Sequence, residues 1–173
     1  MSATEPTQVQ LSAYSPLWPA IFEFERSRLL GILGEDAAVI EHIGSTAVPG
    51  LGAKPIIDVM VGVADLAMVE RRIAELQADG YRYVAEFERA MPMRRYFVKT
   101  HAQPGHFHVH AVLLDSPFWK SHLAFRDALR RDAKLAADYW KLKQRLAARY
   151  PNDREAYTDG KSAFIREAMN RTA

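Results

Sequence analysis

The chain of 173 residues has no cysteine and no apolar run long enough to cross a bilayer. Disulfide bonds and thiolate metal sites are therefore excluded. Residues 1–16 are polar and lack the apolar segment of a signal peptide. From these absences we expect a cytoplasmic protein without a membrane anchor.

The sequence also lacks an excess of one charge, since its formal net charge is only +2. Such a balance, without an aromatic stacking motif, does not favour nucleic acid as a partner. Low-complexity tracts and internal repeats are absent as well. The chain is 49% hydrophobic and 25% charged, which is typical of a soluble globular protein. Its length predicts a single domain over residues 1–173.

Hydrophobic spacing predicts helices and strands in a mixed order. A helix is expected from Trp18 to Gly34, with Pro19 in its first turn, and another over 65–79. Strands are expected at 37–43, 56–63, 94–100 and 107–114, and 56–63 is apolar enough to be central. From Pro117 onward the pattern is helical, with a break at 150–152 and a last helix over 153–169. The fold class is therefore α/β (α+β): a small mixed sheet within 17–115, followed by a helical part over 116–173.

A glycine–serine turn before the central strand is the first candidate ligand site. Gly44 lets the backbone approach a phosphate, and the Ser45 and Thr46 hydroxyls can donate to phosphate oxygens. The same composition is also common in plain turns. Asp58, inside the apolar strand, is harder to explain structurally, because a buried carboxylate is costly unless it is paired or bound to metal. We therefore expect a catalytic Asp58 that holds a divalent metal ion.

Basic side chains near these segments are candidate phosphate ligands. Lys54 can either pair with Asp58 or reach a phosphate. On the strand at 94–100, Arg95 and Lys99 share one face, while Arg94 points to the other. One of these faces would meet a polyphosphate, although a solvated edge strand explains the same residues equally well.

The stretch from His42 to Asp58 reads HIGSTAVPGLGAKPIID. With RRYF at 94–97, HFHV at 106–109, LAFRDALR at 123–130 and YTDGKSAFI at 157–165, it resembles the GrpB family over residues 17–165. The resemblance implies a nucleotidyltransferase-like fold, that of the polymerase-beta and kanamycin nucleotidyltransferase group. Some relatives are fused to dephospho-CoA kinase, which implies a link to CoA metabolism.

Two helical positions join the candidate phosphate ligands. Arg126 shares a helical stripe with His122 and Arg130, at a spacing of four residues. Lys161 resembles the C-terminal lysine of the family and would close over the site.

One position departs from the pattern of the active superfamily, which places a second acid two residues after the first. Here that position is Met60. A third acid usually comes from a neighbouring strand, where this chain has histidines. The usual two-metal acidic site therefore cannot assemble in its standard form.

Three histidines, at positions 106, 108 and 110, alternate along one strand and so share a face. We expect His108 alone to lie opposite Asp58, as metal ligand or base, with the other two toward the strand ends. His42 would join Asp58 and His108 as the third residue of this site. Alternatively, it is a half-buried histidine that hydrogen-bonds to the backbone. Oxygen ligands suit Mg²⁺, whereas imidazole favours Mn²⁺ or Zn²⁺.

Two functions remain open. In the first, the protein binds a nucleoside triphosphate through the Gly-Ser loop and a metal on Asp58, and transfers a nucleotidyl group to a small acceptor. In the second, the protein is catalytically degenerate, and binds a nucleotide or a CoA-like phosphate compound to regulate a partner. Met60 favours the second.

Overall fold

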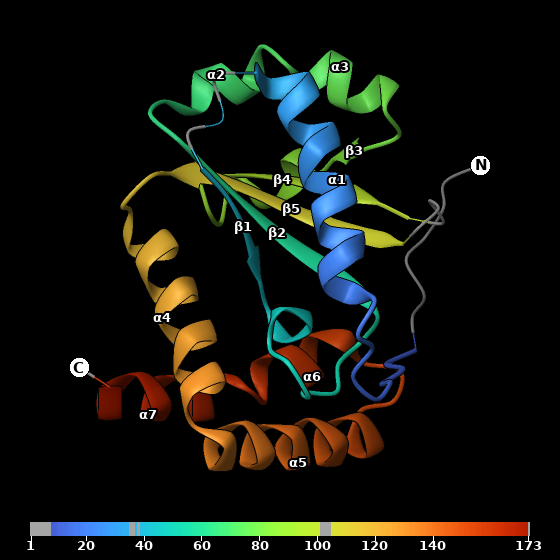
Figure 1. Ribbon diagram of the computed structural model, residues 1–173, viewed down its shortest axis with the longest axis vertical. Coiled ribbons are helices and arrows are strands. Elements are labelled where there is room, and N and C mark those ends of the chain that lie inside the picture. The colour runs from blue at the N-terminus through green and yellow to red at the C-terminus, as the bar shows by residue number, and fades with distance from the viewer. Residues whose placement is uncertain (1–7, 35–36, 38, 101–104, 173) are drawn as a thin grey trace.

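The structure is a computed structural model that describes residues 8–34, 37, 39–100 and 105–172. A five-stranded mixed sheet forms its centre, in the order β1-β2-β5-β4-β3 (Figure 1). Its strands are β1 (Val39–Ile43), β2 (Ile56–Val63), β3 (Arg82–Tyr83), β4 (Arg94–Lys99) and β5 (His106–Leu113). Only β2 and β5 run parallel; the other neighbours are antiparallel. The mixed α/β class expected from the sequence is confirmed.

The pairing register divides the side chains between two faces of the sheet. Asp58 lies opposite Ile43 on β1 and His108 on β5, and His110 lies opposite Tyr96 on β4. Because side chains alternate along a strand, these residues all project from one face, which we call the site face. The other, the core face, carries their sequence neighbours.

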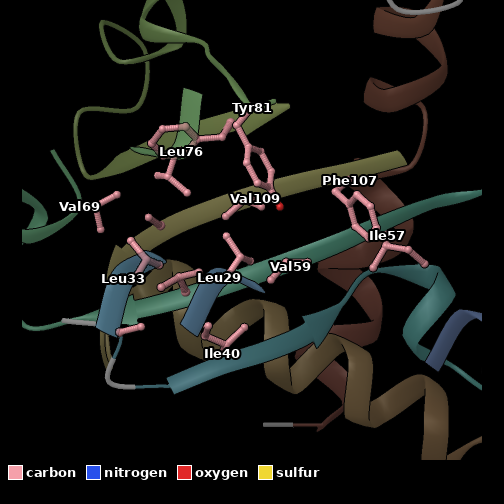
Figure 2. Close-up of a cluster of buried hydrophobic side chains, with 14 of the residues drawn as sticks. Leu29, Leu33, Ile40, Ile57, Val59, Val69, Leu76, Tyr81, Phe107 and Val109 are labelled. Carbon is pink, nitrogen blue, oxygen red and sulfur yellow. The ribbon is translucent and has the colours of Figure 1, made fainter. Parts of the chain in front are cut away.

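The core face packs against the N-terminal helix and two short helices. Helix α1 (Trp18–Leu33) lies across it, with α2 (Leu66–Glu70) and α3 (Ile73–Ala78) nearby (Figure 1). Figure 2 shows Leu29 of α1 meeting Val59 and Val109 between helix and sheet. Fully burying one such aliphatic side chain contributes about 1.5–3 kcal/mol. This layer fixes the sheet and therefore the direction of the site face.

The C-terminal helices are α4 (Pro117–Arg131), α5 (Ala133–Arg149), α6 (Arg154–Asp159) and α7 (Ser162–Thr172). Ser116 caps α4 by accepting from Trp119 N, and Asp132 ends α4 and caps α5 by accepting from Leu135 N. Helix α4 packs on β1 and β5. Within the described residues, no helix is both long and apolar enough to span a membrane.

Several boundaries differ from the sequence prediction. The expected helix at 65–79 is two helices, because Arg72 has φ −104° and ψ 6°, outside the helical range. The expected last helix is divided into α6 and α7 around Gly160 and Lys161. Strand β3 and the 3₁₀ turns at 45–47 and 85–87 were not predicted, because such short elements carry no hydrophobic period. Ala38, inside the strand expected at 37–43, lies outside the described residues.

Candidate functional site

A cavity of about 920 Å³ opens between the site face, the turn at 44–46 and the C-terminal helices. Six of its lining side chains are lysine or arginine, and two are acidic. The cations are Lys54, Arg82, Arg94, Lys143, Arg154 and Lys161; the acids are Asp58 and Glu86. We call it the basic cavity. Its charge suits an anionic ligand.

Asp58 and two imidazoles form the floor of the basic cavity. His108 Nδ1 lies 3.5 Å from Asp58 Oδ1, and His110 Nε2 lies 3.7 Å from the same oxygen. Burial raises the pKa of Asp58, but the hydrogen bonds from His108 and His110 outweigh it and leave the pKa well below its usual value. The carboxylate is therefore ionised. The expected pairing of His108 with Asp58 is confirmed by the register, but His108 is not alone there.

His110 connects the carboxylate to an arginine. Its Nδ1 lies 3.3 Å from Arg94 Nη1. Because a guanidinium can only donate, this ring nitrogen accepts, and we assign the ring proton to Nε2, which faces Asp58. Burial is the largest cause of the lowered pKa of His110, consistent with a neutral ring. The His110 ring thus links Arg94 and Asp58.

The Gly-Ser turn is fixed from two sides. Gly44 has φ +72°, and a Cβ atom there would collide with Asp58 Oδ2. Arg130 of α4 donates from Nε and Nη2 to the Ala47 carbonyl, at 2.9 and 2.8 Å. Tyr139 of α5 belongs to the same buried cluster as Val48, directly after the turn. The glycine allows the turn to lie directly beside the carboxylate, and the C-terminal helices hold it there.

His42 does not join the Asp58 site. It lies opposite Val59 and so on the core face, where its ring stacks on Phe22 at 4.6 Å. Its Nε2 lies 3.0 Å from Thr46 Oγ1, and burial lowers its pKa to about 4. The prediction of His42 as a metal ligand is therefore wrong, because one residue of register turns it away from the carboxylate. It supports the Gly-Ser turn through Thr46, which lines the cavity.

Two predicted lysine ligands, Lys54 and Lys161, do line the basic cavity. Their Nζ atoms lie 5.3 and 4.6 Å from the ring centroid of Tyr157. Lys143 is 2% exposed and donates to the Gly52 carbonyl. Burial, and after it the Lys161 charge, lowers the pKa of Lys143 to about 7; burial, and after it the Lys54 charge, lowers that of Lys161 to about 8. An anion between these lysines would relieve their repulsion.

Arg95 and Lys99, by contrast, lie on the core face. Arg95 Nη2 is 2.6 Å from Glu70 Oε1. Lys99 Nζ is 2.8 Å from both Glu25 Oε1 and Asp79 Oδ2. Both side chains are neutralised by carboxylates and lie outside the cavity, which corrects their expected role as its phosphate ligands. The face that meets the cavity is that of Arg94.

Arg126 is also outside the cavity. Its Nη1 donates to Glu41 Oε2 at 2.6 Å and to the His42 carbonyl at 3.0 Å, and its Nε donates to Asp127 Oδ1 at 2.8 Å. Its guanidinium is thus used to fasten α4 to β1. The expectation that Arg126 binds phosphate in this cavity is corrected accordingly.

The expected divalent metal does not fit these side chains. Met60, two residues after Asp58, is fully buried beside Trp119 and offers no oxygen. Asp58 Oδ1 already faces two imidazole nitrogens, and Oδ2 faces Gly44. In the part of the chain that the structure describes, no group of three or more histidine, aspartate or glutamate side chains is arranged to hold a metal ion.

Several cavity residues escaped the sequence prediction. From the strand pattern, Arg94 was predicted only to lie on the face opposite to Arg95, and His110 only to lie toward the end of its strand. Arg154 of α6 and Lys143 of α5 carried no signal, because helix packing alone brings them to the cavity. The YTDGKSAFI segment does contain Tyr157, so proximity to Lys161 was the one available cue.

The family model that matches this chain is that of the GrpB protein, over residues 8–171. The chain belongs to the GrpB family. It is 34% identical to the glutamate-rich protein GrpB of Alkalihalophilus pseudofirmus, over 94% of this chain and 95% of the relative. The crystal structure of the conserved protein GrpB from Enterococcus faecalis matches with a TM-score of 0.84 and 36% identity, covering 94% of this chain and 96% of that one.

More distant matches concern the fold and a longer relative. The Cid1 poly(U) polymerase, solved with Mg and 3′-dATP bound, matches with a TM-score of 0.51 at 15% identity, over 86% of this chain and 49% of that one. This GrpB-family chain therefore has a nucleotidyltransferase-like fold. The dephospho-CoA kinase of Mycolicibacterium paratuberculosis is 30% identical over 94% of this chain, which spans only 46% of that relative.

Proposed function

We propose that this GrpB-family protein binds a nucleoside triphosphate in the basic cavity, with the polyphosphate among the lysines. The observation that carries the proposal is the contrast between two sets of cations. Lys99 and Arg126 are paired with carboxylates. Lys54, Lys143 and Lys161 line the cavity and make no ion pair with any carboxylate among the described residues.

Such unpaired ammonium groups, removed in part from water, are costly unless a ligand supplies the opposite charge. A triphosphate carries several negative charges in a row and so matches three neighbouring lysines. The Gly44-Ser45 turn lies at the same cavity and can add backbone N–H and hydroxyl donors. The lysines would supply positive charge, and the hydrogen-bond donors of the turn would orient the phosphates.

Nucleotidyl transfer is a second candidate, favoured by the 3.5 Å approach of His108 to Asp58 on the cavity floor. In this proposal Asp58 orients His108, and His108 accepts the proton of an acceptor hydroxyl. The hydroxyl oxygen attacks the α-phosphorus, the bond to the bridging oxygen breaks, and pyrophosphate leaves with its charge held by the lysines. Met60 favours the alternative of binding without turnover.

Isothermal titration calorimetry with ATP, UTP, GTP and CTP tests binding, in EDTA and with Mg²⁺, Mn²⁺ or Zn²⁺. We expect saturable nucleotide binding by wild type. The double variant Lys54→Met/Lys161→Met should bind with an affinity lower by about tenfold or more. Lys134→Met, on the exposed surface of α5, is the matched control and should bind like wild type. Failure of every nucleotide to bind, or equal binding by the double variant, contradicts the proposal.

Turnover is tested separately, by pyrophosphate release in the presence of candidate hydroxyl acceptors. Asp58→Asn and His108→Gln should abolish release and retain most ATP affinity. Nucleotide binding without release in any mixture would favour the binding module. Because a relative is named as a dephospho-CoA kinase, coenzyme A and dephospho-CoA belong in the same panel; tighter binding of either than of ATP would change the proposed ligand from a nucleotide to a CoA-like compound.

A further inference from the structure

The basic cavity has a second positive end, away from the lysines, built around Arg94. The Arg94 Cζ lies 4.8 Å from the ring centroid of Tyr96 and 6.0 Å from that of Phe118. Its Nη1 contacts His110 at 3.3 Å, and Phe87 stands 5.8 Å from Tyr96. We call Arg94, Tyr96 and Phe87 the aromatic–arginine end.

Arg94 has no carboxylate partner among the residues that the structure describes. Its neighbour Arg95 is 2.6 Å from Glu70 and 3.7 Å from Glu88. Burial lowers the pKa of Arg94, so its charge is only partly solvated. A half-buried guanidinium aimed into a cavity, with donors beyond the one used by His110, is prepared for an anion.

The two ends lie against different aromatic rings. Lys54 and Lys161 flank the ring of Tyr157 on α6, whereas Arg94 flanks the rings of Tyr96 on β4 and Phe118 on α4. After burial, the Lys54 charge lowers the pKa of Lys161, and Asp58 raises it. The pKa of His122 is lowered chiefly by burial; Asp58 raises it and Arg94 lowers it further. Asp58 therefore raises the pKa of Lys161 at the lysine end and that of His122, which stacks on Phe118, at the other.

The two ends also differ in the anion that they favour. The lysine end gathers Lys54, Lys143 and Lys161. On the β3–β4 side of the cavity, Arg82, Glu86 and Arg94 all line it, and the opposite charges of Arg82 and Glu86 leave one net positive charge there. Phe87 is 49% exposed, and its ring can offer a stacking surface. A single negative charge attached to a planar ring fits this combination better than a polyphosphate does.

We propose that the aromatic–arginine end binds a second substrate, an aromatic or heterocyclic carboxylate that also carries a hydroxyl group, whose anion pairs with Arg94 and whose ring stacks on Phe87 and Tyr96. This rests on the proposed binding of a triphosphate at the lysine end and names the chemical class of the acceptor. With the carboxylate on Arg94, the acceptor lies beside His110 and Asp58, and therefore next to His108.

The test uses benzoate and nicotinate as probes, titrated into the full chain saturated with tripolyphosphate and followed by NMR line shifts. Wild type should show saturable binding. Arg94→Met should weaken it by about tenfold or more, the usual loss when a charge-assisted bidentate contact is removed. Arg94→Lys, which keeps the charge but not the fork, should be intermediate, and guards against a fold defect in the methionine variant.

Two further variants sharpen the result. Phe87→Ala should weaken benzoate binding without changing tripolyphosphate affinity, and Glu86→Gln should leave benzoate binding equal or tighter. Cyclohexanecarboxylate, which lacks a flat ring, should bind more weakly than benzoate.

Tripolyphosphate binding without benzoate or nicotinate binding would overturn the second-substrate inference and leave the proposed function intact. The second-substrate inference also fails if Arg94→Lys and Arg94→Met bind benzoate as wild type does. Absence of tripolyphosphate binding in a folded wild type would instead overturn the proposed function.

Discussion

Gly44 and Asp58 are in such close contact that the backbone of the turn leaves no room for a side chain at position 44. A Cβ atom there would collide with Asp58 Oδ2, and the φ of +72° with ψ of −172° lies in a region open almost only to glycine. The position of the carboxylate therefore depends on a residue fourteen places earlier in the chain. This contact ties the loop that would bind phosphate to the group that would act on the acceptor.

Gly44→Ala should destabilise the protein by about 1–3 kcal/mol and displace Asp58, because it adds both backbone strain and a collision. Gly50→Ala is the matched control: Gly50 also has positive φ, at +79°, but faces open space. Urea denaturation gives the stability difference, and calorimetry with ATP gives the affinity. Equal losses in both variants would mean that strain alone matters and that the contact with Asp58 does not.

Lys99→Met should lower stability by about 3–5 kcal/mol, because it leaves Glu25, 1% exposed, without its cation. ATP affinity of the folded fraction should not change. Lys161→Met should do the reverse, with a large loss of affinity and a small change in melting temperature. If instead Lys99→Met lost ATP affinity and Lys161→Met lost stability, Lys99 and not Lys161 would be the phosphate ligand.

Arg130→Gln should weaken ATP binding by about three- to tenfold, because the turn at 44–47 loses the two guanidinium hydrogen bonds to the Ala47 carbonyl. Arg131→Gln, one residue further and exposed, serves as the control. If both variants bind ATP like wild type, α4 does not position the turn.

Binding of ATP should take up protons at pH 8.5. In the free protein burial, and then neighbouring lysine charge, lowers the pKa of Lys161 to about 8 and that of Lys143 to about 7, so both are largely neutral at that pH. The bound anion raises both pKa values, whereas the phosphates of ATP are already ionised. Calorimetry in two buffers of different ionisation enthalpy measures the uptake.

At pH 6 the uptake should vanish, because both lysines are protonated before ATP arrives. Lys161→Met should reduce the uptake at pH 8.5. Proton release at pH 8.5, or no dependence on the buffer, would contradict the placement of the polyphosphate beside these lysines.

The sequence was sufficient to predict features that depend on residues close together in the chain. The apolar run at 56–63 predicted the central strand, and the alternation of histidines predicted that His108 and His110 share a face. It also predicted that Arg95 and Lys99 share a face, but not which one. That choice depends on where α1 packs, and the strand pattern contains no information about a distant helix.

His42 shows the same limit on a smaller scale. It is one residue from Ile43, which lies opposite Asp58, and a shift of one residue reverses the face of a strand. Lys143 and Arg154 reach the cavity only because α5 and α6 pack beside the turn. Their roles follow from tertiary packing and could not be predicted from spacing along the chain.

A crystal structure of the protein with a non-hydrolysable ATP analogue tests the central claim most directly. We predict phosphate oxygens within hydrogen-bond distance of Lys54 Nζ and Lys161 Nζ, beside the Ser45 backbone N–H, with the α-phosphate facing Asp58 and His108. An analogue bound away from the basic cavity, or lysines that still face an empty cavity at saturating analogue, would contradict the proposed binding of a nucleoside triphosphate there.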